Sequence, residues 1–229
     1  MGNKTRAAYL HVHDRFSEKD GLADGKEYMD LIRELNDTSS EFEVIGLGVF
    51  NHGHLYSMTK NFKNCKDAKL YSDPKDSKKL KCITGFESYH TERYSDGDDK
   101  RYHLCLMAAT EEGKYNLFRL ATLAGFNKFR GKSGKDFPRN EEAQFQKYGK
   151  GIIASSACIG GIISKLILDG KYDDAKQKAL LYKSWFDDFY LEIQPHTIPE
   201  QLIVNEALVK ISQETGIELL ITCDAHYTR

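Results

Sequence analysis

Two histidines one residue apart, His11 and His13 in the run YLHVH at positions 9–13, are a pair whose type and spacing could do chemistry. In an extended strand, residues i and i+2 lie on one face, about 6.6 Å apart at a rise of ~3.3 Å per residue. Two imidazoles so placed can bind one metal ion. A His-x-His pair standing alone is more often two ordinary core or surface histidines, so the prediction depends on the other candidate ligands.

Asp20 follows this pair by seven residues, and the other candidates lie in or just after further apolar runs: His52, Glu87, His103, Cys158, Asp224 and His226. With the first pair they make nine nitrogen, oxygen and sulfur donors. Four ligands saturate one zinc ion, so nine suit two or three ions, especially if a carboxylate such as Glu87 bridges two of them. A thiolate and several imidazoles favour zinc, manganese or iron over magnesium or calcium.

Seven short apolar runs must position these donors, and we expect each run to be a strand: 7–13, 44–50, 81–87, 102–109, 151–155, 189–194 and 218–223. Segments with apolar residues at three- and four-residue spacing lie between most of them and predict helices: 26–35, 54–65, 111–124, 140–148, 159–168, 172–186 and 199–215. This alternation predicts an α/β fold with a parallel sheet closed into a barrel. A doubly wound open sheet is the alternative. In a barrel, the donors would meet at the C-terminal ends of the strands.

Length and composition favour one soluble domain. The chain has 229 residues, of which 40% are hydrophobic and 29% are charged, and its formal net charge is −1. That charge argues against a protein that holds nucleic acid by a positive field over its whole surface, so we expect any such contact to be local. Five cysteines without a CxxC motif do not indicate a disulfide framework. Without a signal-peptide pattern or a membrane-spanning apolar run, we expect a cytoplasmic protein with no membrane contact.

Two stretches do not fit the alternation of strands and helices. Residues 66–79 are rich in lysine and aspartate and predict a solvated loop. Residues 126–139 mix basic and aromatic side chains, a texture typical of a contact with a single nucleic-acid strand. A solvated loop with a few anchoring aromatic residues is the more common explanation for such a segment.

The motifs together resemble those of a known family. They are YLHVH at 9–13 with Asp20-Gly21, Asn51-His52-Gly53, Gly85-Phe86-Glu87, Tyr102-His103-Leu104, Ser156-Ala157-Cys158, the segment 201–205 and Asp224-Ala225-His226-Tyr227. In this order they are similar to the polymerase and histidinol phosphatase (PHP) domain, in the version found at the N-terminus of the alpha subunit of bacterial DNA polymerase III. The resemblance covers nearly the whole chain, so we expect one PHP domain over residues 1–229.

The resemblance implies a distorted (β/α)7 barrel of the PHP type with a trinuclear metal site. It would assign His11, His13, Glu87 and Asp224 to one ion. It would assign Glu87, His103 and Cys158 to a second ion, and Asp20, His52 and His226 to a third. Among these, Asp20, Glu87 and His226 are the candidate catalytic residues. All nine positions hold a suitable donor in this sequence.

The chain departs from the family pattern in two respects. Asn51 stands where the family usually has an aspartate before the histidine, and its neutrality would weaken the orientation of His52. The family domain also normally continues past Asp-x-His into a further helix and then into polymerase modules. We therefore expect either a piece of a longer polymerase or a free-standing PHP protein of the kind that suits a compact phage genome, with polymerase modules in cis or in trans.

The function that this resemblance implies is a metal-dependent phosphoesterase with two or three divalent ions. Its most specific form is a 3′–5′ exonuclease that removes nucleotides from a single-stranded or mismatched DNA 3′ end during replication. The candidate substrate contacts are Arg93, Arg101, His196 and Tyr227. Two alternatives stay open, a non-catalytic structural module of a replicative polymerase and a small-molecule phosphatase of the histidinol-phosphate type.

Overall fold

The structure, a computed structural model, describes residues 4–17, 20–67, 80–94, 100–130, 134 and 136–228. Contacts within the chain divide it into two compact units. The first unit comprises Met1–Asn51, Leu55–Gly85 and Asp224–Arg229, and the second comprises His52–His54 and Phe86–Cys223. Each unit has its own strands and helices, and each holds its own group of candidate ligands.

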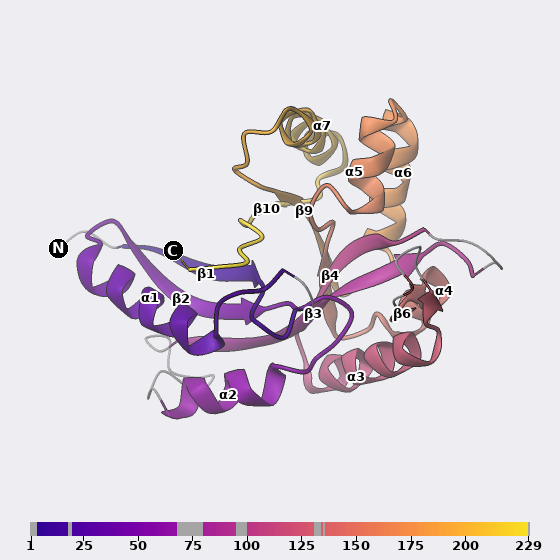
Figure 1. Ribbon diagram of the computed structural model, residues 1–229. Coiled ribbons are helices and arrows are strands. Elements are labelled where there is room, and N and C mark those ends of the chain that lie inside the picture. The colour runs from indigo at the N-terminus through magenta and orange to yellow at the C-terminus, as the bar shows by residue number, and fades with distance from the viewer. Residues whose placement is uncertain are drawn as a thin grey trace. The chain divides into compact units, whose positions relative to one another are not determined.

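The first unit is built on three strands: β1 (Thr5–Val12), β2 (Phe42–Val49) and the first residues of β3 (Lys81–Thr91). β1 pairs with β2 and β2 with β3, both in parallel. Helices α1 (Gly25–Thr38) and α2 (Met58–Asp67) lie along these strands, as Figure 1 shows. A capping box starts α1, because the Asp24 carboxylate accepts from the Lys26 amide and the Glu27 carboxylate accepts from the Asp24 amide.

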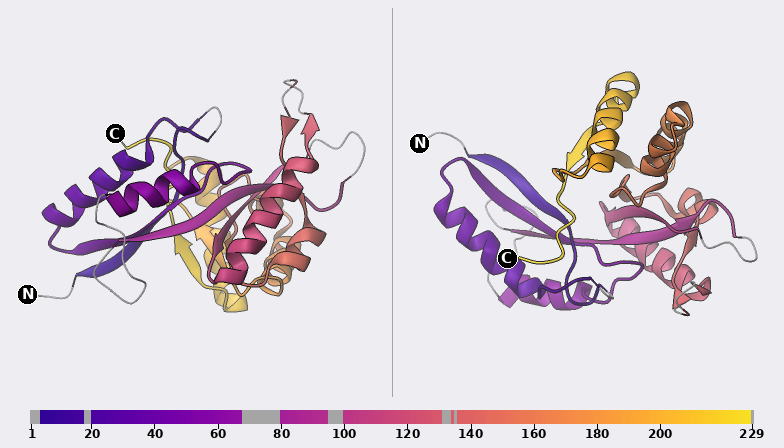
Figure 2. Two further views of the ribbon diagram at one scale, coloured as in Figure 1. Left: turned by 90° about the horizontal axis from the view of Figure 1, so that it is seen from below. Right: turned by 45° about the horizontal axis from the view of Figure 1, so that its top comes forward.

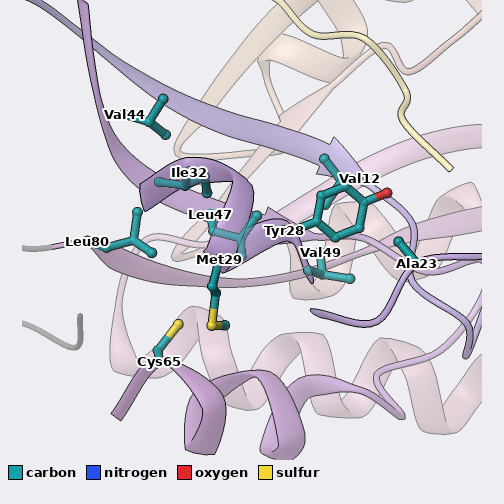
Figure 3. Close-up of a cluster of buried hydrophobic side chains, with 10 residues drawn as sticks. All are labelled: Val12, Ala23, Tyr28, Met29, Ile32, Val44, Leu47, Val49, Cys65 and Leu80. Atoms are coloured by element: carbon teal, nitrogen blue, oxygen red, sulfur yellow. The ribbon is translucent and has the colours of Figure 1, made fainter. Parts of the chain in front are cut away.

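A compact apolar cluster holds this unit together (Figure 3). Its members come from β1, α1, β2, α2 and the segments beside them: Val12, Ala23, Tyr28, Met29, Ile32, Val44, Leu47, Val49, Cys65 and Leu80. Each larger side chain buried in this way stabilises the fold by about 1.5–3 kcal/mol. The chain end also belongs to this unit. In Figure 2 the last residues run beside α1, and the Thr228 hydroxyl donates to Glu27.

The second unit contains the rest of β3 followed by β4 (Tyr102–Ala108), β8 (Ile152–Ser155), β9 (Asp188–Ile193) and β10 (Leu219–Ile221). These strands are neighbours in that order. β8 is parallel to β9 and β9 to β10, whereas β4 is antiparallel to β8. The short β7 (Asn140–Glu141) pairs with the end of β3, and β5 (Phe129–Arg130) forms a hairpin with β6 (Asp136–Phe137).

Five helices accompany the strands of the second unit: α3 (Glu111–Phe126), α4 (Glu142–Tyr148), α5 (Ile162–Leu168), α6 (Tyr172–Lys183) and α7 (Pro199–Thr215). Pro199 occupies the first turn of α7, where its missing amide proton is not needed, and Gly216 ends that helix with a left-handed backbone. None of the described helices is long and apolar enough to cross a lipid bilayer.

The α/β class is confirmed. So are the seven predicted strands and the seven predicted helices, whose boundaries differ by a few residues in most cases. Two details were wrong. Glu87 does not end its strand, because β3 continues to Thr91. The sheet is not wholly parallel, because β4 runs antiparallel to β8. The two-residue strands β5, β6 and β7 are too short to give an apolar pattern.

The expectation about cysteines also needs a correction, because Cys65 of α2 and Cys82 of β3 form a disulfide. The last turn of α2 brings the first thiol to the start of β3, and the pair is 17 residues apart in sequence. Cys105, Cys158 and Cys223 are not in disulfides. Most of the predicted lysine-rich loop, residues 68–79, lies outside the described residues. So do Lys132 and Lys135 of the basic segment.

A buried polar chain crosses the second unit from β3 to α6. The His90 ring nitrogen Nε2 lies 2.8 Å from the Tyr182 hydroxyl, which donates to the Glu142 carboxylate at 2.6 Å. Lys178 donates to both Glu142 and Glu92. Burial lowers the pKa of the His90 imidazole from 6.5 to about 3, helped by the nearby charges of His103 and Lys178. The folded protein therefore holds this imidazole neutral.

This depressed pKa predicts a specific acid sensitivity. Between pH 6.5 and 3 the unfolded chain binds a proton at residue 90 and the folded chain does not, so this contribution to stability is lost as the pH falls through that window. His90→Gln should remove it, which flattens the pH dependence of the unfolding free energy by about 1.4 kcal/mol per pH unit. Urea unfolding in EDTA from pH 7 to 5 measures this. The exposed His196→Gln is the control, and equal slopes for His90→Gln and wild type would contradict the prediction.

Candidate metal centres

Three predicted ligands converge in the first unit, around one carboxylate oxygen. Asp224 Oδ1 lies 3.3 Å from His11 Nε2 and 3.1 Å from His13 Nε2. The two histidines are buried, and the three ligand atoms lie within 4.8 Å of one another. A nitrogen lone pair and a carboxylate oxygen at such distances repel each other unless a proton or a cation lies between them. This group therefore has the donor set and the spacing to hold a metal ion.

His226 and Asp20 extend this group. The His226 ring stacks on that of His13, with centroids 4.3 Å apart and planes 10° from parallel. Its Nδ1 lies 2.9 Å from the backbone carbonyl of Asp224 and donates to it, which leaves Nε2 as the atom able to bind a metal. That Nε2 lies 3.6 Å from Asp20 Oδ2. The carboxylate of Asp20 is about half exposed, so it is open to a substrate or to water.

Side chains that the sequence analysis missed orient this group. Ser17 Oγ lies 2.8 Å from His13 Nδ1, so it fixes the ring with Nε2 toward Asp224. The Tyr28 ring lies in the apolar cluster, and its hydroxyl is 2.9 Å from the backbone carbonyls of both His13 and Ala225. A tyrosine on an amphipathic helix gives no sequence signal for such a role, because its core position alone explains it.

The backbone is unusual where these ligands lie. His11, Ala157 and Asp224 are the only residues other than glycine in the described chain with left-handed backbones, at φ 53°, 58° and 47°. Two of them are candidate ligands, and the third precedes Cys158. Such conformations cost about 1–3 kcal/mol each and persist only where the surroundings impose them, which is common at functional sites. At His11 the conformation accompanies a register shift between β1 and β2, so simple strand alternation does not place its ring.

Backbone pairing joins the two ends of the first unit. Val12 and Ala225 form a parallel bridge, in which the His13 amide donates to the Ala225 carbonyl and the Ala225 amide to the His11 carbonyl. The segment with Asp224 and His226 therefore lies against the end of β1. The first and last candidate ligand pairs of the sequence are therefore neighbours in the fold.

Asn51 has a different role from the one expected. Its amide donates to Asp14 Oδ1 and to Ser57 Oγ, both at 2.8 Å, and its Oδ1 accepts from the Asp14 backbone amide. Asn61 donates to the other oxygen of Asp14. Asn51 thus fixes the turn that follows His13, rather than the ring of its neighbour. An amide suits this position because it must donate to a buried carboxylate.

The second unit holds a separate group around the fully buried Glu87. Its Oε2 lies 2.5 Å from His52 Nδ1, and its Oε1 lies 2.8 Å from His103 Nδ1. The three ligand atoms lie within 4.8 Å of one another. A bridge between His52 and Glu87 sets the backbone here, and the Gly53 amide donates to the Glu87 carbonyl. Gly53 has a φ of +71°, and a Cβ there would meet Pro138.

Cys158 joins this group through a tight turn. Its Sγ lies 3.5 Å from His103 Nδ1 and 4.0 Å from Glu87 Oε1, and it accepts from the Gly160 amide at 3.4 Å. A Cβ at Gly160 would lie 3.0 Å from the His103 ring, tighter than most real Cβ contacts, so a larger residue here would push against that ring. The antiparallel pairing explains the meeting, since it puts the start of β4, with His103, beside the end of β8.

The four predicted substrate contacts differ in their surroundings. Arg101 lies against Tyr89, whose ring stacks on that of His52. Arg93 and His196 are exposed on the second unit, and Tyr227 is exposed beside His226 on the first. Their part in substrate binding stays a prediction, as does the sharing of ions among all nine ligands.

The Tyr28 hydroxyl offers a test of the first group. Tyr28→Phe keeps the ring in the core and removes only the bond to the ligand-bearing backbone. We expect the affinity for Zn²⁺ or Mn²⁺ to fall by about tenfold or more, because residues that orient ligands typically contribute that much. Calorimetric titration of metal-stripped protein measures this. The matched control is Tyr9→Phe, which removes a hydroxyl from a tyrosine packed against the same cluster. Equal affinities for Tyr28→Phe and wild type would show that the hydroxyl does not orient the ligands.

The Asn51–Asp14 pair predicts a destabilising change toward the more usual family residue. Asn51→Asp would place two buried carboxylates against each other, and at pH 7 it should lower the unfolding free energy by about 3 kcal/mol. Adding Asp14→Asn exchanges the amide and the carboxylate and should restore much of that loss. Denaturant unfolding of metal-free protein measures all three variants. A neutral effect of Asn51→Asp, or no rescue in the double variant, would refute this explanation of Asn51.

Comparison with known proteins identifies the family of the chain. The family described as the PHP domain matches residues 9–196. Proteins named DNA polymerase III subunit alpha are similar to nearly the whole chain. The one from Borreliella burgdorferi is 34% identical over 99% of this chain, that from Deinococcus radiodurans 31% over 97%, and that from Thermus aquaticus 31% over 100%. The chain spans only 18%, 16% and 18% of those relatives. The PHP family is a superfamily of metal-dependent phosphoesterases, and PHP domains bind metal ions. The chain belongs to the PHP domain family, in the branch found in replicative polymerases.

Proposed function

We propose that this protein is a metal-dependent phosphoesterase that removes nucleotides from a DNA 3′ end, single-stranded or mismatched, in DNA replication. The observation that carries the proposal is the surroundings of Glu87. A fully buried carboxylate contacts two imidazoles and lies near a thiol, and these are the donors that zinc, manganese and iron prefer. The names of the relatives support a replicative context.

Divalent ions bound by these side chains would polarise a phosphoester and supply hydroxide at neutral pH. The nine residues proposed to hold two or three such ions are His11, His13, Asp20, His52, Glu87, His103, Cys158, Asp224 and His226. The protein's part is to fix these donors in place. In the second unit the buried Glu87 holds the Nδ1 atoms of two imidazoles, and in the first unit Asp224 holds two Nε2 atoms.

Asp20 and His226 suit proton transfer in this scheme. His226 keeps its proton on Nδ1 by donating to the Asp224 carbonyl, so its Nε2 can accept a proton or bind a metal. The Asp20 carboxylate, 3.6 Å away and about half exposed, can exchange a proton with water or a leaving group. With Glu87, these are the residues we propose as catalytic.

Two other functions fit parts of the same structure. A structural module of a replicative polymerase fits the relatives, of which this chain covers less than a fifth. Such a module does not need a buried carboxylate surrounded by metal-binding donors. A phosphatase for small molecules such as histidinol phosphate would use the same donors, but the relatives named here are polymerase subunits. We propose polymerase modules, in cis or in trans, as partners. The location we propose is the cytoplasm of a bacterial cell, with the protein encoded by a bacterium or a phage.

One assay separates the three functions. Metal-stripped protein, reloaded with Mn²⁺ or Zn²⁺, is given a primer with a mismatched 3′ end and, separately, histidinol phosphate. We expect shortening of the primer from its 3′ end. Release of phosphate from histidinol phosphate alone would identify a small-molecule phosphatase, and no product from either substrate would favour a structural module.

Variants link that activity to the two groups. Glu87→Gln should lower the rate by about a hundredfold or more, since it removes a charge that positions two other ligands. His11→Ala and Asp224→Asn should lower the metal content found by elemental analysis. Glu142→Gln is the matched control, because it makes the same change at another buried carboxylate of the second unit. Unchanged metal content in His11→Ala and Asp224→Asn would refute the ligand assignment in the first unit.

A further inference from the structure

Arg101 is held between two aromatic rings on the second unit. Its guanidinium carbon lies 4.9 Å from the centre of the Tyr89 ring and 4.2 Å from that of the Phe137 ring. The residue is exposed, and within the described part of the chain it has no hydrogen bond or ion pair. Cation–π contacts engage the faces of a guanidinium and leave the N–H groups at its edge available to an anion.

The Tyr89 ring connects Arg101 with the Glu87 group. It stacks on His52, with centroids 5.2 Å apart and planes 13° from parallel, and it meets the His103 ring at 60° and 5.1 Å. Arg101 also comes two residues before His103 along an extended segment, so their side chains start on the same face. Its cation therefore lies one aromatic ring away from two predicted metal ligands.

The second ring against Arg101, that of Phe137, is itself held in place by further contacts. Phe137 of β6 stacks on Phe129 of β5, at 5.5 Å and 28°, and the Arg139 guanidinium lies 4.4 Å from the Phe129 ring centre. Arg139 is buried, and its Nη1 donates to the carbonyl of Lys100 at 2.8 Å. This bond fixes the backbone immediately before Arg101. The cation is thus pre-ordered, which lowers the entropy lost when it binds a ligand.

We propose that Arg101 binds a phosphate of the nucleic-acid strand whose end is held at the Glu87 group. This inference rests on the proposed function, and it assigns the substrate class to a phosphodiester chain. The planar guanidinium can donate two hydrogen bonds to one phosphate, which a lysine cannot do. The net charge of the chain is −1, so binding to a strand depends on such local cations.

The test separates binding from hydrolysis. Affinity for a fluorescent single-stranded oligonucleotide is measured in EDTA at several salt concentrations, for wild type, Arg101→Gln, Arg101→Lys and Phe137→Leu. Arg119→Gln is the control, since it removes one exposed charge from α3 of the same unit. Primer shortening with Mn²⁺ is measured in parallel. Competition by inorganic phosphate shows whether Arg101 binds the phosphate of a nucleic-acid strand or any free phosphate ion.

We expect Arg101→Gln to bind about 10–100-fold more weakly and to lower the slope of log affinity against log salt by about 0.7, the value for one phosphate on a single strand. Arg101→Lys and Phe137→Leu should keep the slope and bind more weakly, and Arg119→Gln should match wild type.

An unchanged slope and affinity in Arg101→Gln, with primer shortening by wild type intact, would overturn the inference and leave the function standing. The inference would also be overturned if the same concentration of inorganic phosphate displaced the oligonucleotide from wild type and from Arg101→Gln. Loss of binding in Arg101→Gln when wild type does not shorten primers would support the phosphate contact and refute the exonuclease.

Discussion

A carboxylate without access to water has to be compensated by its neighbours, and the Glu87 group follows from that constraint. Burying an ion without a partner is costly, so the groups around Glu87 must supply positive charge or donated protons. Its neighbours are two imidazoles and, farther away, a thiol, whose charges depend on protonation and on metal binding. The turn at Gly53, the close approach of Gly160 and the antiparallel start of β4 all serve to bring those groups to one point.

The first unit meets a similar demand by a strained backbone. His11 and Asp224 adopt left-handed conformations, which cost free energy in residues other than glycine, and each comes directly before a residue of the bridge between Val12 and Ala225. Tyr28 anchors this arrangement to the apolar cluster, because its ring is core and its hydroxyl reaches the ligand-bearing backbone. The apolar core thus helps to hold two imidazoles and a carboxylate at distances that are unfavourable unless a proton or a cation lies between them.

The candidate donors and the elements could be predicted from the sequence better than their geometry. Donor types and apolar runs are local properties, so the nine candidate donors and the seven longer strands could be recognised in the sequence. The direction of β4 could not be read, because pairing depends on partners far away in sequence. The bond between Asn51 and Asp14 and the position of Arg101 between Tyr89 and Phe137 could not be predicted either, because these contacts also join residues that are far apart in sequence. Residues 126–139 were recognised as basic and aromatic, but the pattern did not show that Phe137 would brace Arg101.

The buried chain around Glu142 shows what a structural carboxylate looks like in this fold. Its charge is compensated by the Tyr182 hydroxyl and the Lys178 ammonium, partners that keep their protons near neutral pH. Glu87 instead lies against the imidazoles of His52 and His103, groups that can bind a metal ion as well as donate a proton. Donors of this kind suit a metal ion better than the hydroxyl and ammonium around Glu142 do. That contrast between the two buried carboxylates is the physical reason for proposing a metal-dependent enzyme rather than a scaffold.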